Sequence, residues 1–364
     1  MTDKPFLLYV GSYTESMPHV SLNEGQGISV FAFSPGDGSL KAIGVAPTIN
    51  PSYLAFSSSG QYLYSVEERA SEQGPAVCAW CVDSRTALPV LINRQLLPGG
   101  YPCHLTVSPS GDLLAIACYE EGRVCLLQLL GDGSLGAISQ VFQHEGSGPC
   151  HVRQKGPHSH MVSFLDERTL LATDLGADCI VVYRRIACSG LWEKQQVTAL
   201  PKGSGTRHLA LHPDGRHVLA LGELTGEVTL LRWKDDYLIT IDSATSLSAE
   251  EAASGKSSSA AIRMSLDGRV VYVSHRASGQ VVTLVCDAAA GQIRIKENIP
   301  CGGNIPRDIV LSPDNRWLLC AAQDSSAIFV FQRTSDGGLI PAGPAIGTWA
   351  GTPVCLAWHP DSGR

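Results

Sequence analysis

The sequence contains no basic segment longer than a few residues. Lys and Arg number 27 against 34 Asp and Glu, which gives a formal net charge of −7. Proteins that bind nucleic acids or anionic membrane surfaces usually carry a concentrated basic face. We therefore expect neither nucleic acid nor a membrane as a partner. Any anion must be bound by individual arginines against an unfavourable overall field.

The sequence also lacks a secretion signal and a long apolar run. The N-terminal segment Met-Thr-Asp-Lys-Pro does not have the basic-then-apolar pattern of a signal peptide, and the apolar run that follows is too short to span a bilayer. These absences predict a cytoplasmic protein. In that compartment we expect the 12 cysteines to be reduced and mostly buried, without a disulfide framework.

A second pair of cysteines with zinc spacing is missing as well. Cys78 and Cys81 form one Cys-x-x-Cys pair, but residues three apart on a strand point to opposite faces of the sheet. We therefore expect no metal, and the sequence indicates no other cofactor.

No proline-rich or serine-rich linker divides the 364 residues, so we expect one domain over residues 1–364. The loosest stretch, Ser243 to Ser259, is interpreted as a long surface loop. Alternatively it contains a short helix, because Ser248-Ala-Glu-Glu has the pattern of a capped first turn.

What the sequence does contain is a repeat of about eighteen residues, in which an apolar run, a Pro-Asp-Gly-like corner and a second apolar run recur about every fifty residues. The corners fall at Gly60, Gly111, Glu167, Gly215, Gly268, Asn315 and Ser362. Pro, Asp and Gly favour tight turns, and the flanking runs are too short for helices. Short strands and tight turns at this period predict an all-β protein, a seven-bladed β-propeller.

The two ends of the chain predict how the ring closes. The last repeat, Pro353 to Ser362, stops directly after its corner, whereas the first segment, Leu7 to Tyr13, is a lone strand with no corner before it. We expect these segments to form the last blade together, with its innermost strand supplied by the C-terminal segment. No sheet edge would then remain open between the first and last blades.

The repeat also predicts where polar side chains converge. The start of each innermost strand and the end of each second strand lie on the same face of the disc, around the central axis, where ligand sites commonly form. The second-strand ends hold Glu68, Tyr119, Leu175 (next to Asp174), Glu223, Arg276 and Gln323, with Tyr13 from the shared blade. The innermost-strand starts hold His104, His158, His160, Arg207, His208, Arg307 and Asp308.

Each of these residues alone could be an ordinary polar group at a strand end, but the set as a whole predicts a ligand site. The other histidines are interpreted differently. His212 and His359 occupy corner positions that are Ser in other repeats, so we expect them to cap their corners. His19, His144 and His217 have no recognisable partner and are left outside the site.

Several strings together resemble the seven-bladed propeller lactonase family, which includes bacterial 6-phosphogluconolactonases and fungal carboxy-cis,cis-muconate lactonizing enzymes. They follow the family's order along nearly the whole chain: Tyr9-Val-Gly-Ser-Tyr-Thr14, Asn50-Pro-Ser-Tyr-Leu-Ala55, Pro157-His-Ser-His160, Asp174-Leu-Gly-Ala-Asp178, Gly205-Thr-Arg-His-Leu-Ala210, Glu223-Leu224 and Pro306-Arg-Asp308. The resemblance implies chemistry on a lactone ring, first of all hydrolysis of 6-phosphogluconolactone to 6-phosphogluconate.

The resemblance also implies site residues. In the cyclising members a histidine, two arginines and a glutamate form the active site. Matching by motif assigns these roles to His158, Arg207, Glu223 and Arg276, with Arg263 and Arg307 as alternatives for the second arginine. Glu223 or His158 would be the base that activates water, and arginines would stabilise the oxyanion. Substrate binding is expected from Arg307, His160, Glu68, Tyr119, His104 and Gln323.

Two alternatives to a lactonase remain at this point. One is a carboxymuconate-type cycloisomerase, and the other is a non-catalytic interaction propeller, because a fold alone does not fix a function. The partner expected for an enzyme is a small anionic lactone or carboxylate, and the chain is expected to be a monomer or a small homo-oligomer.

Overall fold

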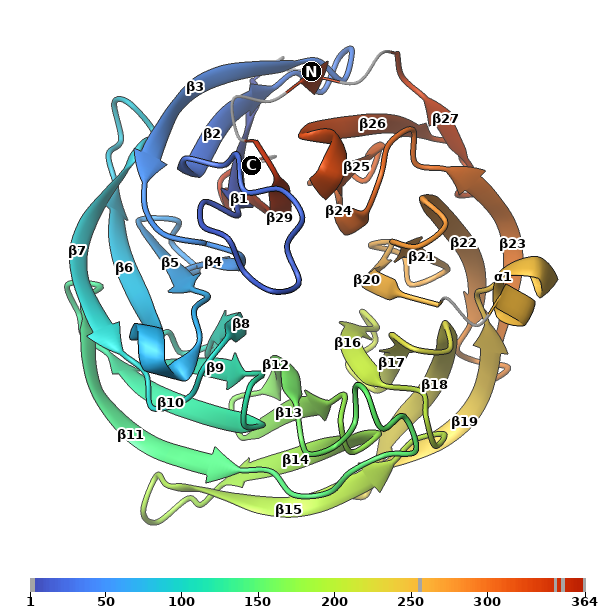
Figure 1. The fold of residues 1–364 in the computed structure, drawn as a ribbon, viewed down its shortest axis with the longest axis horizontal. Coiled ribbons are helices and arrows are strands. Elements are labelled where there is room, and N and C mark those ends of the chain that lie inside the picture. The colour runs from blue at the N-terminus through green and yellow to red at the C-terminus, as the bar shows by residue number, and fades with distance from the viewer. Residues whose placement is uncertain (1–3, 255–256, 344–345, 348–350, 363–364) are drawn as a thin grey trace.

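The structure, a computed structural model, describes residues 4–254, 257–343, 346–347 and 351–362. Seven antiparallel sheets stand around a central axis and form a disc (Figure 1). The predicted all-β, seven-bladed propeller is therefore confirmed. Within the described residues, helical structure is limited to α1 (Ala249–Ser254), η1 (Ser71–Gln73) and η2 (Gln323–Ser325).

Each blade is a sheet of at least four strands, which follow one another from the axis outward. The blade shared by the chain ends contains β29 (Pro353–Trp358), β1 (Phe6–Ser12), β2 (Gly27–Phe33) and β3 (Leu40–Pro47). The next two contain β4 (Leu54–Phe56), β5 (Tyr62–Glu67), β6 (Ala76–Val82) and β7 (Pro89–Leu96), and then β8 (Pro102–Val107), β9 (Leu113–Cys118), β10 (Arg123–Leu129) and β11 (Leu135–Gln143).

The remaining four blades follow in the same order around the ring. They contain β12 (Ser159–Asp166), β13 (Thr169–Asp174), β14 (Cys179–Arg185) and β15 (Trp192–Ala199), then β16 (Thr206–Leu211), β17 (His217–Gly222), β18 (Glu227–Lys234) and β19 (Tyr237–Thr245). The last two contain β20 (Ser259–Met264), β21 (Val270–His275), β22 (Gln280–Asp287) and β23 (Gln292–Pro300), then β24 (Pro306–Leu311), β25 (Trp317–Ala322), β26 (Ala327–Arg333) and β27 (Leu339–Pro341), with β28 (Ile346–Gly347) also on β26.

The corners of the repeat connect each innermost strand to the second strand. Gly111 shows the common form: its N–H donates to the carbonyl of Ser108 at 2.9 Å, and its φ of +77° suits glycine. The hydroxyl of Ser108 accepts a hydrogen bond from the N–H of Leu113 at 3.0 Å. The corner without Pro-Asp-Gly is tighter, because Asp166 pairs directly with Thr169.

Two corners use histidine in place of serine, as predicted. Nδ1 of His212 accepts a hydrogen bond from the N–H of Asp214 at 3.2 Å, and Nδ1 of His359 accepts one from the N–H of Asp361 at 3.2 Å. Each ring also reaches the neighbouring blade, with Nε2 of His359 at 3.1 Å from the carbonyl of Gly60. The histidines therefore brace one corner against the next.

The shared blade closes the ring as predicted. β29 pairs with β1 in antiparallel register, with Leu8 opposite Trp358 and Val10 opposite Leu356. The N–H of Leu7 also donates to Oγ of Ser362 at 3.0 Å. The innermost strand of this blade therefore comes from the end of the chain, as the sequence indicates.

The hydrophobic core is divided among the interfaces between blades. A buried apolar cluster fills each interface around the ring, including the one between the last blade and the shared blade. The second strands are buried on both faces, so β9, β13 and β17 read as continuous apolar runs. This explains why the repeat is visible in the sequence as short uninterrupted hydrophobic stretches.

The expected burial of the cysteines is confirmed, and of the two interpretations of Ser243 to Ser259 the structure agrees with the short helix, because β19 extends to Thr245 and α1 follows it. All 12 cysteines are free; nine are buried, Cys81 and Cys150 are partly buried, and Cys188 is exposed. The short helix α1 begins at a capping box, in which Oγ of Ser248 accepts from the N–H of Glu251 at 3.2 Å and the N–H of Ser248 donates to that glutamate at 2.8 Å. Among the described residues, no helix is long and apolar enough to cross a bilayer.

Candidate active site

Six innermost strands carry a β-bulge near their start, at the face opposite the corners. In four of them the extra residue is Cys103 in β8, His160 in β12, Arg207 in β16 and Arg307 in β24. A bulge interrupts the alternation of a strand and re-aims a side chain. Two successive side chains can then reach the axis, as in β16, where Nη1 of Arg207 lies 3.1 Å from Nε2 of His208.

The second-strand ends add another ring of side chains at the same face. Glu68, Tyr119, Glu223 and Arg276 each follow directly after the last residue of β5, β9, β17 and β21. A cavity of about 340 Å³ opens where the two rings meet on the axis. It is lined by His19, Glu68, Tyr101, Cys103, Tyr119, Arg153, His160, Glu223, Arg276 and Arg307.

Three arginines surround the carboxylate of Glu223. Oε2 lies 2.8 Å from Nη2 of Arg276 and 3.0 Å from Nε of Arg207, and Oε1 accepts a hydrogen bond from Nη2 of Arg153 at 2.7 Å. Burial opposes the charge of Glu223, but Arg276, Arg153 and Arg207 outweigh it and hold its pKa well below the usual range. The carboxylate is therefore ionised at neutral pH and fixes the positions of the arginines.

Arg307 differs from these arginines in having no carboxylate partner. Nη2 of Arg307 donates to the hydroxyl of Tyr13 at 2.7 Å, and its guanidinium lies 5.2 Å from the centre of that ring. Within the described residues no Asp or Glu forms an ion pair with it, although it lines the cavity. Its charge is therefore available to an anionic ligand.

Glu68 forms a second acidic centre on the other side of the cavity. The hydroxyl of Tyr13 donates to its Oε2 at 3.0 Å, and Nε2 of His19 lies 3.3 Å from its Oε1. Burial opposes ionisation of Glu68, but His19 and Arg307 favour it, and its pKa is lowered. The cavity thus contains two ionised carboxylates in different surroundings.

Three histidine rings, the axial histidines, follow one another from His160 in the cavity lining to His208 and His104, which lie outside the lining. The ring centres of His160 and His208 lie 5.3 Å apart, those of His208 and His104 lie 5.7 Å apart, and His104 packs 3.9 Å from Tyr53. Burial, together with neighbouring arginines, lowers the pKa of each histidine well below its usual value. All three rings are therefore neutral at physiological pH.

Several predicted residues do not line the cavity. His158 lies just before β12 and stacks on Tyr119 with ring centres 4.4 Å apart, while its Nδ1 lies 2.9 Å from the carbonyl of that tyrosine. The bulge at His160 instead turns that histidine into the cavity. The repeat register cannot separate these two histidines, because it does not locate the bulge.

The other predicted residues outside the lining lie deeper or to one side. Arg207 is buried behind Glu223, and burial lowers its pKa to about 9, so it stays charged at neutral pH. His104 belongs to the axial histidines. Gln323 begins η2, and its Nε2 donates to Oδ1 of Asp324 at 2.9 Å. Arg263, an alternative for the second arginine, is paired with Asp308 at 2.8 Å.

Sequence reasoning missed four residues of the lining. Arg153 and His19 come from the long loops over residues 144–158 and 13–26, where no repeat register applies, and Tyr101 precedes β8. Cys103 had a usable signal. It stands directly before His104, as Arg207 stands before His208, so aligning the blades would have placed it on the axis.

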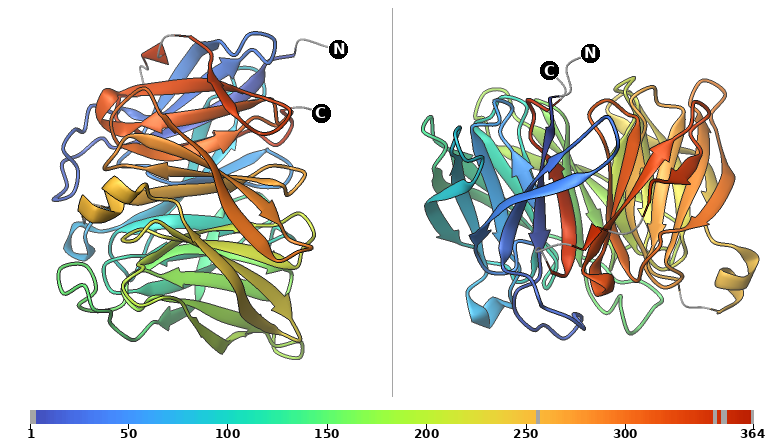
Figure 2. Two further views of the ribbon diagram at one scale, coloured as in Figure 1. Left: turned by 90° about the vertical axis from the view of Figure 1, so that its right-hand side faces the viewer. Right: turned by 90° about the horizontal axis from the view of Figure 1, so that it is seen from above.

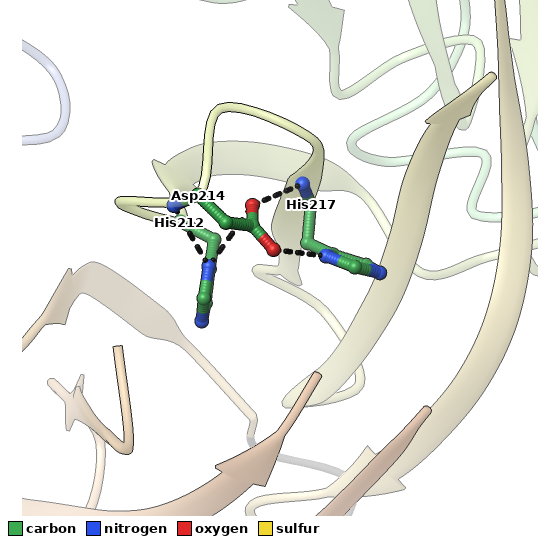
Figure 3. A group of neighbouring side chains, drawn as sticks. All are labelled: His212, Asp214 and His217. Carbon is green, nitrogen blue, oxygen red and sulfur yellow. Dashed lines mark hydrogen bonds and ion pairs between the residues drawn. The ribbon is translucent and has the colours of Figure 1, made fainter. Parts of the chain in front are cut away.

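A cluster of His212, Asp214 and His217 lies in a corner, with donor atoms within 4.8 Å of one another (Figure 3). Its donor atoms already serve the turn. Nδ1 of His212 accepts from the N–H of Asp214, and Nδ1 of His217 lies 2.6 Å from Oδ2 of the same aspartate. The same histidine brace occurs at His359, so we interpret the cluster as structural.

Comparison with known proteins places this geometry in context. The family described as "Lactonase, 7-bladed beta-propeller" matches residues 7–358. The 6-phosphogluconolactonase of Bacillus subtilis (strain 168) is 27% identical over 353 residues, which are 96% of this chain and 97% of that protein. The 6-phosphogluconolactonase of Formosa agariphila is 30% identical over 341 residues, 91% of this chain and 93% of that protein.

A solved structure agrees with these relatives. The periplasmic gluconolactonase of Pseudomonas aeruginosa superposes with a TM-score of 0.87 at 30% sequence identity, covering 98% of this chain and 99% of that one. The family match runs through all seven blades and includes the strands that bring the cavity residues to the axis. The chain therefore belongs to the seven-bladed β-propeller lactonase family.

Proposed function

We propose that this protein hydrolyses the lactone ring of a small anionic sugar acid, and that 6-phosphogluconolactone is its substrate. The observation that carries the proposal is the axial cavity, in which Arg153 and Arg276 flank an ionised Glu223 while Arg307 has no carboxylate partner among the residues that the structure describes. The relatives support it, because two are named 6-phosphogluconolactonase and a third gluconolactonase.

The residues of the cavity suit lactone hydrolysis. Attack of water on the lactone carbonyl creates an oxyanion, which fixed guanidinium groups stabilise more in the transition state than in the substrate. We assign this role to Arg276, with Arg153 beside it. Glu223 and the buried Arg207 hold these groups in place. Arg307 binds the phosphate or carboxylate of the substrate through its planar fork of donors.

This arrangement changes the role that the sequence suggested for Glu223. A carboxylate that faces three guanidinium groups and has a strongly lowered pKa is a weak proton acceptor. We therefore assign Glu223 to positioning the arginines. His158, the alternative base, lies outside the cavity lining and its Nδ1 faces a backbone carbonyl.

The hydrolytic names of the relatives favour ring opening over the cycloisomerase and scaffold alternatives. We also propose a cytoplasmic location. The 12 free cysteines support it, because thiols persist in reducing compartments. Since the Pseudomonas relative is called periplasmic, fractionation of cells that express the full chain tests the location.

The function is tested by hydrolysis of freshly prepared 6-phosphogluconolactone above the spontaneous rate, with uncharged gluconolactone alongside. We expect Arg276→Ala to lower kcat by about 10²–10³-fold, because it removes an oxyanion donor. Arg307→Ala should raise KM for the phosphorylated lactone by about tenfold or more and change KM for gluconolactone little, because only the former carries the anion.

Two further variants are assayed in the same way: Glu223→Gln tests the positioning role of the carboxylate, and Arg85→Ala is the control. Glu223→Gln should reduce kcat because it releases the arginines, whereas Arg85, which is exposed on a loop, should tolerate the change to alanine. Wild-type protein that does not accelerate hydrolysis of either lactone would end the proposal. Equal activity of wild type, Arg276→Ala and Glu223→Gln would also end it.

A further inference from the structure

Lactone hydrolysis requires a group that takes a proton from the attacking water, and neither Glu223 nor His160 supplies a good one. Glu223 is held ionised by three arginines. His160 is almost fully buried, and burial and Arg207 lower its pKa well below the usual value, so it attracts a proton weakly. A base must therefore come from another part of the lining.

His19 is the remaining histidine in the lining. It lies in the loop over residues 13–26, which curls over the centre of the disc in dark blue (Figure 1) and protrudes from the face that carries α1 (Figure 2). The side chain of His19 is 42% exposed, so bulk water can reach the ring, and the residue also lines the cavity. It therefore combines solvent access with a position in the cavity lining.

The loop that carries His19 is anchored on both sides. Tyr13 and Met17 are buried against Val354. Oδ1 of Asn50 accepts from the N–H of Thr14 at 2.8 Å, and the N–H of Gly25 donates to the carbonyl of Tyr13 at 2.9 Å. These contacts fix the base of the loop to the inner strands, so the histidine is held over the cavity.

A chain of polar contacts orients the imidazole. Arg307 donates to the hydroxyl of Tyr13, which donates to Oε2 of Glu68, and Oε1 of Glu68 lies 3.3 Å from Nε2 of His19. A buried carboxylate at one ring nitrogen fixes the tautomer and leaves the lone pair on the other nitrogen. Within the described residues, no hydrogen bond occupies Nδ1 of His19.

We propose that His19 is the general base of this site, with Glu68 as its positioning residue, an assignment that rests on the proposed lactonase function. Nδ1 of His19 accepts a proton from water as the water oxygen bonds to the lactone carbonyl carbon. The carbonyl electron pair moves onto its oxygen beside Arg276. The ring C–O bond then breaks as this pair returns, and the leaving alkoxide takes the proton from the imidazolium.

The charged surroundings of His19 agree with this role. The titratable groups that share the cavity side with it are Glu68, Tyr13, Tyr101, Cys103 and Arg307. Burial raises the pKa of both tyrosines and of the thiol, so these three stay neutral. Glu68 is then the anion in contact with the imidazole, and Arg307 is linked to that anion through Tyr13.

The test is the pH dependence of kcat/KM for 6-phosphogluconolactone in wild type, His19→Gln, Glu68→Gln and the control His151→Gln. An imidazole changes charge between about pH 5 and 8, so wild type should lose activity as pH falls through this range. His19→Gln should lower kcat by about 10²–10⁴-fold and lose this dependence. His151 lies on an exposed loop, so His151→Gln should keep the wild-type kcat and the wild-type pH dependence.

Two further measurements separate catalysis from folding. In His19→Ala, added imidazole should restore part of kcat, which a purely structural role would not allow. Glu68→Gln should lower kcat less than His19→Gln, because the imidazole is still present but a carboxylate no longer orients it. Thermal melts of each variant establish that the protein is folded.

The possible failures are distinguishable. Wild type without activity on either lactone overturns the proposed function. Active wild type with an unchanged pH limb and near-normal kcat in folded His19→Gln overturns the assignment of His19 and leaves the lactonase in place. Absence of rescue by imidazole, together with equal loss at all pH values, would also count against a base at this position.

Discussion

At the scale of single residues, the three axial histidines give the fold a specific sensitivity to acid. His104, His160 and His208 have pKa values well below 6.5 in the folded protein because of burial. In the unfolded chain they would bind protons below about pH 6.5, whereas in the folded chain they do not. The free energy of unfolding is therefore not reduced by these histidines above this pH, and it decreases as pH falls below it.

We expect His104→Phe to weaken this dependence. Both ring nitrogens of His104 have no hydrogen-bond partner in the described structure, and a phenyl ring can still pack on Tyr53. Removing one such group should reduce the slope of unfolding free energy against pH by about 1.4 kcal/mol per unit below pH 6. Urea unfolding from pH 7.5 to 5 measures it. An unchanged slope would mean that His104 does not stay neutral in the folded state.

Glu223 and Arg276 could be placed from the sequence, because both stand directly after a second strand and the repeat carries that position to the axis. The choice between His158 and His160 could not be made, since it depends on a bulge that the hydrophobic pattern does not reveal. The sequence could not place His19 in the site, for a different reason. Its partner Glu68 is close in space only because the loop folds back over the ring.

At the scale of elements, the corners combine backbone conformation with contacts between blades. Gly111 and Gly268 have nearly the same φ, +77° and +74°, a region that other residues enter at a cost. A Cβ on Gly111 would meet nothing within 4 Å, whereas one on Gly268 would lie 2.4 Å from Nε2 of His212. The two positions therefore separate backbone strain from steric conflict.

We expect Gly111→Ala to lower the free energy of unfolding by about 1–2 kcal/mol through backbone strain alone. Gly268→Ala should cost more, because it also displaces the ring of His212, which bonds to the carbonyl of Gly268 at 3.1 Å. Urea denaturation at neutral pH compares the two variants. Equal losses would indicate that the histidine brace contributes nothing to the corner.

The bulges explain why strand prediction was easier than site prediction. Turn residues and apolar runs define the corners and strands, so the blades and their order follow from the sequence. A bulge adds one residue without a composition signal. Comparing blades does reveal it afterwards, since Cys103-His104, Arg207-His208 and Arg307-Asp308 occupy equivalent places.

At the scale of the whole molecule, ring closure depends on the short strand β29. Removing residues 353–362 would expose the edge of β1 and leave Asp308 without the N–H of Leu356, from which it accepts a hydrogen bond at 2.9 Å. An unpaired inner edge promotes association with other chains. We expect this truncated chain to be largely aggregated or unfolded, as measured by size-exclusion chromatography and circular dichroism.

A circular permutant provides the matched control. Joining the original ends through a short Gly-Ser linker is feasible, because Leu7 and Ser362 are hydrogen-bonded at 3.0 Å. New ends between Pro109 and Ser110, in an exposed corner, keep every strand. This permutant should unfold in one transition, as expected for a single domain over residues 1–364. Folded truncated protein, or separate transitions in the permutant, would contradict the dependence on β29.

The shared blade also determines how the molecule can be handled. β1 begins and β29 ends on the corner side of the disc, whereas the cavity opens on the side where the innermost strands start. A support, bead or second enzyme attached through either terminus would therefore be joined to the face of the disc that carries the corners. The axial cavity would stay turned toward the bulk solution, without any engineered spacer.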